Sequence, residues 1–395
     1  MMGKVLLIII LFILTILSGC SNYKELNQLS IVLGIGIDYL PKEGLYEVTY
    51  QTVKPSENAA KGTGSGSTPI INYQATGKTI YEAAGNTANF FSRQNIYSHI
   101  QLVVIGEQLA KKESLNFIFD VFERDAGARA NVPVLIARGA GVKTTMDMLS
   151  TIDKIPVQAL VGKIKNSSKN IGEHDQTKIY EVIEDLTNDG SEPAISGVSI
   201  VGSKKIGGRN ENLETMNKTF TKLNGVAMFK GGKLVGWLDG SKTKSLLIIK
   251  NKIKDTNVRF QCDKEHYNNI IVDRLKSDTN VNVKNNQAFI TTEVKASGHI
   301  VELLCNKDIS KREVLKQYEQ KAEKELEKEI KDGIFTAQKL QSDVFGFGEM
   351  LHITHPKIWK DHKRKWKKFF SEAKINVEVK VNIDGTGMRI KPYPF

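Results

Sequence analysis

The chain has 395 residues, of which 40% are hydrophobic and 25% charged, and its formal net charge is +12. This is the composition of an ordinary folded protein, and the length exceeds what one small hydrophobic core organises, so we expect two or three domains. The positive charge suits an anionic membrane surface, an acidic partner or simple solubility, and does not by itself indicate nucleic acid.

The first twenty residues are typical of a secretory signal. Lys4 supplies a positive charge, and the run Val5–Leu17 is apolar apart from Thr15. Small residues then precede Cys20, and the run is shorter than the roughly 20 residues of a membrane-spanning helix. The Leu-Ser-Gly-Cys ending resembles the lipobox of bacterial lipoproteins. In that pathway the Cys thiol takes a diacylglycerol, and cleavage makes this Cys the first mature residue.

We therefore predict a signal peptide over residues 1–19 and a lipidated tether over 20–28, with Cys20 as the lipidation site. Two acyl chains, at about 0.8 kcal/mol per buried CH₂, make a stable anchor. An uncleaved signal anchor and an ordinary secretory signal with an incidental cysteine are the alternatives. No second long apolar run follows, so we expect no further membrane span.

Residues 29–142 predict an N-terminal α+β domain with a mixed sheet, because strand-like and helix-like segments alternate there. The expected strands are 29–39, 46–53, 70–75, 99–106 and 132–137, and the expected helices are 79–92 and 107–125. Gly34 and Gly36 lack the third glycine and the following helix of a dinucleotide-binding site, so we assign them to close packing or a bulge. The glycine-rich run 55–68 is interpreted as a surface loop.

The remainder predicts two further units. Residues 143–190 are mostly helical in pattern, and a strand at 194–201 and a hairpin at 219–237 complete a middle domain over 143–240. From 241, strands at 256–262, 280–284 and 287–304, a long helix, helices at 342–351 and 356–373, and a strand at 375–383 predict a C-terminal α+β domain over 241–395. The predicted fold class is α+β, with three domains in series, each a mixed or antiparallel β-sheet with packed helices.

The long helix begins, by pattern, with Ser310 as N-cap and Glu313 completing a capping box. Its charged surface and single apolar stripe allow a coiled-coil seam, but so short a stripe favours packing on its own sheet. The stripe consists of Leu315, Tyr318, Ala322, Leu326 and Ile330.

A second helix combines rings with basic residues. Trp359, Trp366 and Phe370 fall at i, i+7 and i+11, so one face collects the rings and the other collects Lys and Arg. Such a helix can lie on anionic lipid, or bury its rings in the core and leave the basic side chains solvated. The strand that follows favours the core.

No catalytic constellation is visible, so we expect no enzyme activity, no cofactor and no metal site. His-Glu-x-x-His, Cys-x-x-Cys and Gly-x-Ser-x-Gly are all absent from the sequence. The one histidine cluster is His352, His355 and His362, which we interpret as a solvated helix end because Pro356 interrupts the helix. Cys262 and Cys305 are either a disulfide or two buried free thiols.

The chain also resembles the Ger(x)C family, the C subunits of nutrient germinant receptors in spore-forming bacteria. The segments that carry the resemblance are Lys24–Asp38, Thr76–Ala83, Tyr97–Glu107, Arg124-Asp125 with Ala128-Arg129, Gly225–Phe229 with Lys233–Leu238, Gln341–Gly348, and the Trp359/Trp366 helix. They cover essentially the whole mature chain in the family's order. One departure is Ser21-Asn22 after the cysteine, where relatives often have Trp-Asp.

The resemblance implies a non-catalytic lipoprotein on the outer face of the spore's inner (cell) membrane. It implies assembly with an integral-membrane A subunit and a transporter-like B subunit, and a response to nutrients that triggers germination. Export past a lipobox argues separately against nucleic acid as a partner. The one functional residue that the resemblance assigns to this sequence is the family's lipid-bearing cysteine, which corresponds to Cys20. The alternatives are a solute-binding lipoprotein delivering a ligand to a membrane permease, which requires a two-lobed cleft, and a cell-wall lytic enzyme, which requires paired carboxylates or a metal.

Overall fold

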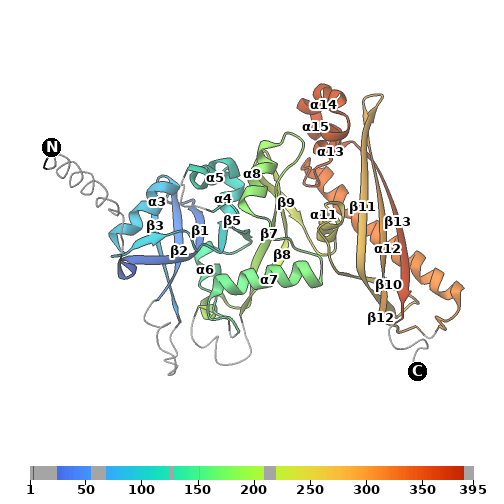
Figure 1. The fold of residues 1–395 in the computed structure, drawn as a ribbon, viewed down its shortest axis with the longest axis horizontal. Coiled ribbons are helices and arrows are strands. Elements are labelled where there is room, and N and C mark those ends of the chain that lie inside the picture. Colours follow the sequence, from blue (N-terminus) through green and yellow to red (C-terminus); the bar gives the residue numbers. More distant parts are fainter. Residues whose placement is uncertain are drawn as a thin grey trace.

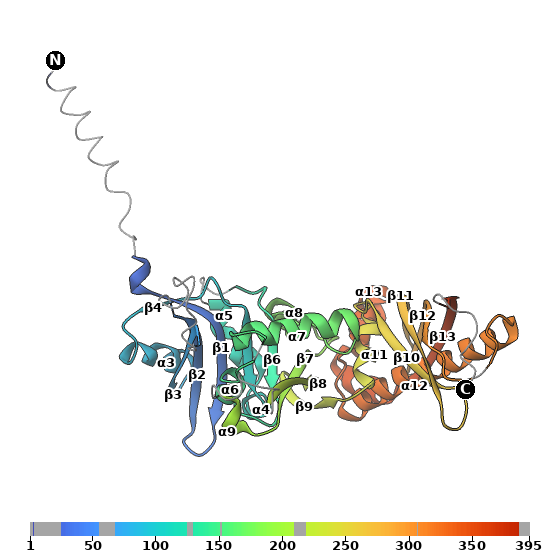
Figure 2. The same cartoon turned by 90° about the horizontal axis from the view of Figure 1, so that it is seen from below.

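The structure is a computed structural model that, from Glu25 onward, describes residues 25–54, 68–124, 129–150, 152–208, 219–305 and 307–386. Within them, helices pack on one sheet of nine strands and one of four, in agreement with the predicted α+β class (Figure 1). The two sheets follow each other along the long axis of the molecule (Figures 1 and 2). No helix among these residues combines the length and the apolar character that crossing a membrane requires.

The first sheet is mixed. Its strand order is β3-β2-β1-β5-β6-β7-β8-β9, and β4 pairs with β1 outside this path. The strands are β1 (Leu29–Leu40), β2 (Leu45–Val53), β3 (Ile70–Gly77), β4 (Gln94–Ile96), β5 (Leu102–Gly106), β6 (Val134–Ala137), β7 (Ala194–Val201), β8 (Phe220–Lys230) and β9 (Lys233–Leu238). Because this sheet continues across residue 142, the division into three domains stays a prediction.

Helices cover both faces of the first sheet. One face carries α3 (Ile80–Asn86), α4 (Glu107–Lys112), α5 (Leu115–Arg124) and α8 (Ile179–Thr187). The other face carries α6 (Val142–Met146) and α7 (Pro156–Asn170). Three further short elements in this part of the chain are η1 (Leu26–Gln28), η2 (Thr87–Asn89) and α9 (Lys204–Gly207). Burial on both faces explains why β5 and β6 are uninterrupted apolar runs.

The glycines of β1 make room for the helices on one face. A Cβ on Gly34 would lie 2.4 Å from Val157 Cγ2, and one on Gly36 would lie 2.2 Å from Val142 Cγ1. The strand also bulges between Val32 and Gly34. Close packing and a bulge, as predicted, are therefore the reasons for these glycines.

The second sheet has the strand order β10-β11-β12-β13, antiparallel except for the parallel β12–β13 pair. The strands are β10 (Thr256–Gln261), β11 (Tyr267–Lys284), β12 (Gln287–Glu302) and β13 (Lys374–Gly385). The helices of this part are α11 (Lys242–Ile249), α12 (Arg312–Leu340), α13 (Phe347–Thr354), α14 (Pro356–His362), η3 (Lys363–Lys365) and α15 (Trp366–Ser371).

The long helix α12 packs along the second sheet and seals one of its edges. Four residues of the predicted stripe are fully buried, which confirms packing on its own sheet: Tyr318, Ala322, Leu326 and Ile330. The carboxylates of Glu319 and Glu323 accept hydrogen bonds from the backbone N–H of Ile383 and Val381, at 2.9 and 3.2 Å. These side chains satisfy donors that an edge strand otherwise leaves open.

The predicted start of α12 is wrong. The helix begins at Arg312 with Lys311 as N-cap, and no side chain caps it. The Ser310 hydroxyl donates to Asp308 Oδ1 instead. The carboxylate two residues earlier competes for this hydroxyl, as short polar side chains often allow.

One hydrophobic core joins the two sheets. Residues Thr243–Ile249 of α11 are buried on all sides. The same core contains Met228 and Leu238 of the first sheet and Ile270 of the second. The sheets are therefore connected through packed side chains and not through a solvated linker.

Candidate functional site

The predicted lipidation site, Cys20, lies outside the described residues, as do the rest of the predicted cleavage region and residues 55–67. The fold begins with η1, and residues Leu29–Ile31 of β1 pair in parallel with Gln94–Ile96 of β4. The sheet thus starts where the predicted tether ends.

The segment Gln341–Gly348, which follows α12, makes a tight turn between the two sheets. Gln341 has a φ of 54° and Gly346 a φ of 77°. Glycine adopts such angles without the strain that other residues carry. The prediction of a helix from Ser342 is therefore wrong, because the turn occupies its first residues and α13 begins at Phe347.

Asp343 lies at the centre of this turn and is 3% exposed. Its Oδ1 accepts from the backbone N–H of Gly346 and Phe347, at 3.0 and 3.1 Å. Its Oδ2 accepts from the N–H of Gly348 and from Nε1 of Trp366, both at 2.8 Å. Burial raises the pKa of Asp343 to about 6, and hydrogen bonds from Trp366, Gly348 and Phe347 oppose that rise. The carboxylate therefore fastens the turn to α15.

The same turn is bound, through backbone contacts, to the loop that leads into β7 of the first sheet. Glu192 N donates to the carbonyl of Asp343, and Glu349 N donates to that of Gly190, both at 3.0 Å. A Cβ on Gly190 would lie 2.4 Å from Glu349 N, so this contact requires glycine. The buried Glu192 carboxylate accepts from Gly231 N in the β8–β9 turn, at 2.9 and 3.0 Å. We call this region the junction: the turn Gln341–Gly348, together with Gly190, Glu192 and Gly231. Its hydrogen bonds form one continuous cluster.

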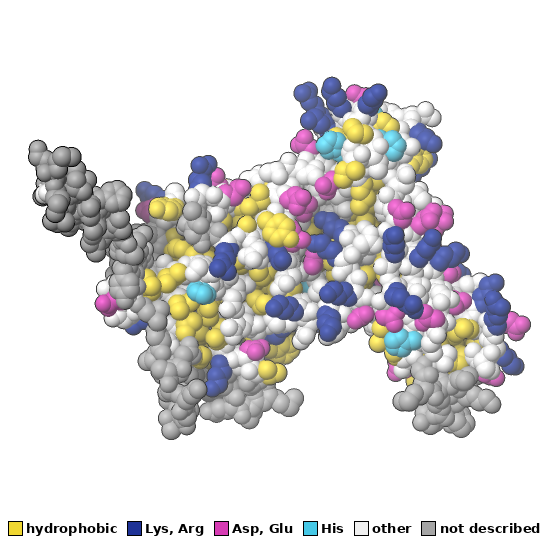
Figure 3. All heavy atoms as spheres, in the orientation of Figure 1, with side chains coloured by type: hydrophobic (Ala, Val, Ile, Leu, Met, Phe, Trp, Pro, Cys, Tyr) yellow, Lys and Arg dark blue, Asp and Glu magenta, His cyan; other side chains and the backbone are white. Residues whose placement is uncertain are grey.

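The aromatic and basic segment, predicted as one helix over 356–373, is instead α14, η3 and α15, so that prediction is wrong in its limits. Its side chains nevertheless divide as the core alternative predicts. Trp359, Trp366 and Phe370 are at most 3% exposed, and the two indoles make an edge-on pair with centroids 5.6 Å apart. The basic side chains of this segment, including Lys360 and Arg364, are exposed. Figure 3 shows Lys and Arg gathered over the α14–α15 end of the molecule.

The three histidines of the predicted helix-end cluster make separate contacts. The ring of His352 stacks on Trp359 with centroids 5.8 Å apart. Nδ1 of His362 lies 2.8 Å from the carbonyl oxygen of Ile358. His355 is instead the N-cap of α14. Within the described residues, none of the three belongs to a group with metal-ligand spacing.

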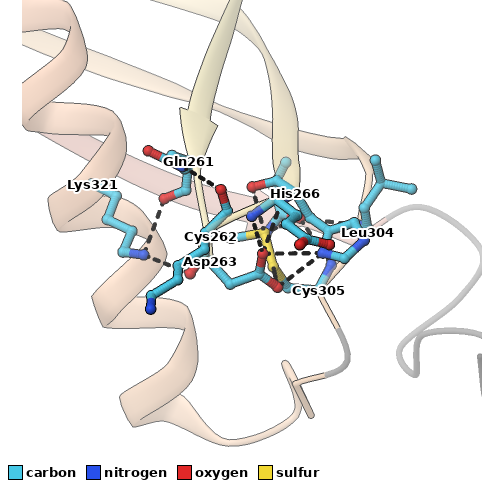
Figure 4. Close-up of a disulfide and its surroundings, with 10 residues drawn as sticks. Gln261, Cys262, Asp263, His266, Leu304, Cys305 and Lys321 are labelled. Atoms are coloured by element: carbon cyan, nitrogen blue, oxygen red, sulfur yellow. Dashed lines mark hydrogen bonds and ion pairs between the residues drawn. A yellow bond between two sulfur atoms is a disulfide. The ribbon is translucent and has the colours of Figure 1, made fainter.

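Cys262 and Cys305 form a disulfide, with Cα atoms 6.2 Å apart, so the bridge and not the pair of free thiols is present (Figure 4). Their sulfurs and the Asp263 carboxylate lie within 4.8 Å of one another. Sulfurs bonded to each other are not thiolate ligands, so this group is a cross-link. Lys321 of α12 donates to the carbonyls of Gln261 and Cys262, at 3.0 and 2.8 Å, which fastens the helix to the bridged strand end.

Two family models match the chain. Residues 22–200 match the spore germination protein N-terminal domain, and residues 224–387 match the C-terminal domain described as spore germination B3/GerAC like. The chain belongs to the Ger(x)C family of spore germination proteins. The junction at Asp343 therefore lies within the C-terminal domain of the family, and its contacts at Gly190 and Glu192 lie within the N-terminal domain.

Relatives of this Ger(x)C protein match over their full length. Spore germination protein KC of Bacillus subtilis (strain 168) is 29% identical, over 99% of this chain and 98% of its own. Spore germination proteins A3 and B3 of the same organism are 26% and 24% identical, over 97% and 96% of this chain and 98% and 97% of theirs. The crystal structure of the GerBC protein has a TM-score of 0.56 at 19% identity, covering 89% of this chain and 97% of that one, and shares the fold.

Sequence reasoning missed the roles of Asp343 and Glu192. Both are acidic residues next to apolar or glycine-rich sequence, where a buried carboxylate needs several donors. Asp343 is saturated by four N–H donors and Glu192 is 7% exposed, so both act on the fold. The available signal was the position of Asp343 inside a run with two glycines, which supply close backbone N–H groups.

Proposed function

We propose that this Ger(x)C protein is the lipid-anchored, non-catalytic C subunit of a spore nutrient germinant receptor. The observation that carries the proposal is the match of both halves of the chain to germination-protein domains, together with full-length similarity to named germination proteins. The body is held by diacylglyceryl-Cys20 on the outer face of the spore inner membrane. There it assembles with the integral-membrane A and B subunits.

The anchor is supported by the sequence around the cleavage site. A basic start, a short apolar run and small residues before Cys20 direct the chain out of the cytoplasm. Two acyl chains hold a protein at a membrane where one chain binds only marginally. Cys20→Ala should therefore move the body from the membrane fraction to the soluble fraction and abolish its labelling with tritiated palmitate. The matched control is Ser21→Ala, which keeps the thiol and should stay labelled and bound.

Receptor membership is tested in spores that lack the gene. Loss of dipicolinate release toward one nutrient, with non-nutrient triggers intact, is the expected result, because a receptor subunit acts only on its own stimulus. A tagged copy should restore that response and bring the A and B subunits with it when purified from spore membranes. A tagged copy that restores nothing and purifies without either subunit would contradict the assignment.

A further inference from the structure

An apolar pocket opens between α3 and the end of α5, above β1 and β2. Its floor consists of Ile35 and Ile37 from β1 and Val48 and Tyr50 from β2, all at most 7% exposed. Figure 1 shows α3 and α5 beside each other at this end of the sheet. The volume of the pocket is about 240 Å³.

The walls of the pocket come from two helices and one loop. The wall from α3 consists of Ile80, Tyr81, Ala84 and Gly85. The opposite wall is Val121 and Phe122 of α5, and Tyr97 and Ile100 close one end. The described lining holds no charged side chain, and its only polar side-chain atoms are tyrosine hydroxyls. Two of these, on Tyr50 and Tyr97, are hydrogen-bonded to each other at 3.2 Å.

The pocket has a mouth on the surface of α3. Tyr81 is 75% exposed, and a Cβ added to Gly85 would meet no atom within 4 Å. Ala84 and Gly85 are the smallest side chains available, so α3 leaves open a space that a larger residue there would fill. Among the described residues, a molecule can therefore enter between Tyr81 and the end of α5 without a change in the backbone.

The size and the chemistry of the pocket limit what it can hold. An engineered apolar cavity of about 150 Å³ in another protein stays dry and binds benzene. A space of about 240 Å³ is thus large enough for a fused two-ring molecule such as indole. A carboxylate or an ammonium group inside it would lose its hydration without gaining a counter-charge.

We propose that this pocket is a binding site for a small uncharged molecule with an apolar, ring-sized body. The site lies in the N-terminal domain, far along the chain from the Asp343 junction, and it does not depend on the proposed receptor function. Recognition comes from shape and from the apolar floor, and the tyrosine hydroxyls offer one polar contact to a ligand that carries a single N–H or O–H group.

The test is calorimetric titration of indole into the mature chain carrying Cys20→Ser, which needs no detergent that would compete for an apolar site. We expect a Kd of about 0.1 mM, in the range that ligand efficiency allows for so few atoms. Indole-3-acetate has the same rings with a carboxylate and should bind at least tenfold more weakly.

Two variants test whether indole binds in this pocket. Ala84→Phe and Gly85→Leu fill the pocket from α3 and should each weaken indole binding at least tenfold. The control is Asn116→Phe, which adds the same ring on the exposed face of α5 outside the pocket and should leave the Kd within twofold. Circular dichroism verifies folding, and Gly85→Leu keeps the test valid if Ala84→Phe does not fold. A wild-type Kd above 5 mM, equal binding of indole-3-acetate, or unchanged binding in the folded filling variants would each overturn the proposal.

Discussion

The junction makes a sharp prediction about Asp343→Ala. The substitution leaves four buried donors without an acceptor, namely the backbone N–H groups of Gly346, Phe347 and Gly348 and Nε1 of Trp366. At about 1–3 kcal/mol for each unsatisfied donor, the gross loss is about 4–12 kcal/mol. Removing the carboxylate also removes the free-energy cost of burying its charge, which offsets part of this loss.

The size of this offset follows from the raised pKa of Asp343. A rise from 3.8 to about 6 disfavours the ionised form in the folded protein by about 3 kcal/mol. The lost hydrogen bonds therefore exceed the relief, and we expect Asp343→Ala to lower the free energy of unfolding by about 4 kcal/mol at pH 7.5. That is a large share of the roughly 5–15 kcal/mol that stabilises a typical domain.

The pH dependence gives the prediction a second test. Because the folded-state pKa is raised, the wild type gains stability as the pH falls toward and below 6, and the variant lacks this gain. The difference between them should grow by about 1.4 kcal/mol from pH 7.5 to pH 5. Urea unfolding followed by tryptophan fluorescence measures both values, since Trp366 is itself at the site. The control Asp361→Ala, on the exposed face of α14, should stay within about 0.5 kcal/mol. A loss below 1 kcal/mol at both pH values would refute this account of the junction.

Two further predictions concern the part of the chain that carries the second sheet. Burial raises the pKa of Glu329 to about 7 from 4.5. The wild type should therefore lose about 2.5 kcal/mol of stability between pH 5 and pH 8 that Glu329→Gln does not lose, and unfolding curves at the two pH values measure the difference. The disulfide closes a loop with a sequence separation of 43, so the double variant Cys262→Ser/Cys305→Ser should be less stable by about 2–4 kcal/mol. Reduction of the wild type should reproduce that loss, and a variant as stable as the oxidised wild type would show that the bridge is unimportant to folding.

Much of the fold was predictable because its signals are local. The alternation in β13 and the stripe of α12 each indicate one buried face, and the structure agrees. The apolar runs of β5 and β6 indicate burial on both faces, which the structure also has. The failures are elements whose limits depend on distant partners. The predicted helix 107–125 is two helices, α4 and α5, because Leu115 N donates to the carbonyl of Gly232 in the β8–β9 turn.

The start of β11 was missed for a related reason. The register with β12 shifts between Val272 and Arg274, so the alternation that identifies a strand breaks there. At the candidate site, the burial of the ring-bearing face around Trp366 was predictable from its spacing. The partners of Asp343 were not, because they come from its own turn, from α15 and from the loop before β7, and no spacing in the sequence encodes that meeting.

The boundary between the two family domains, residues 200 to 224, falls between β7 and β8, which are antiparallel neighbours in one sheet. A chain cut there would stay together as one particle, since β8 and β9 complete the sheet of the other half. Backbone hydrogen bonds from Glu192 N to the carbonyl of Asp343 and from Glu349 N to that of Gly190 also join the two halves. Within the described residues, the two domains defined by sequence therefore share one sheet and one hydrophobic core. We expect a tilt imposed at the N-terminal end to turn the C-terminal sheet with it, because buried side chains join the two sheets.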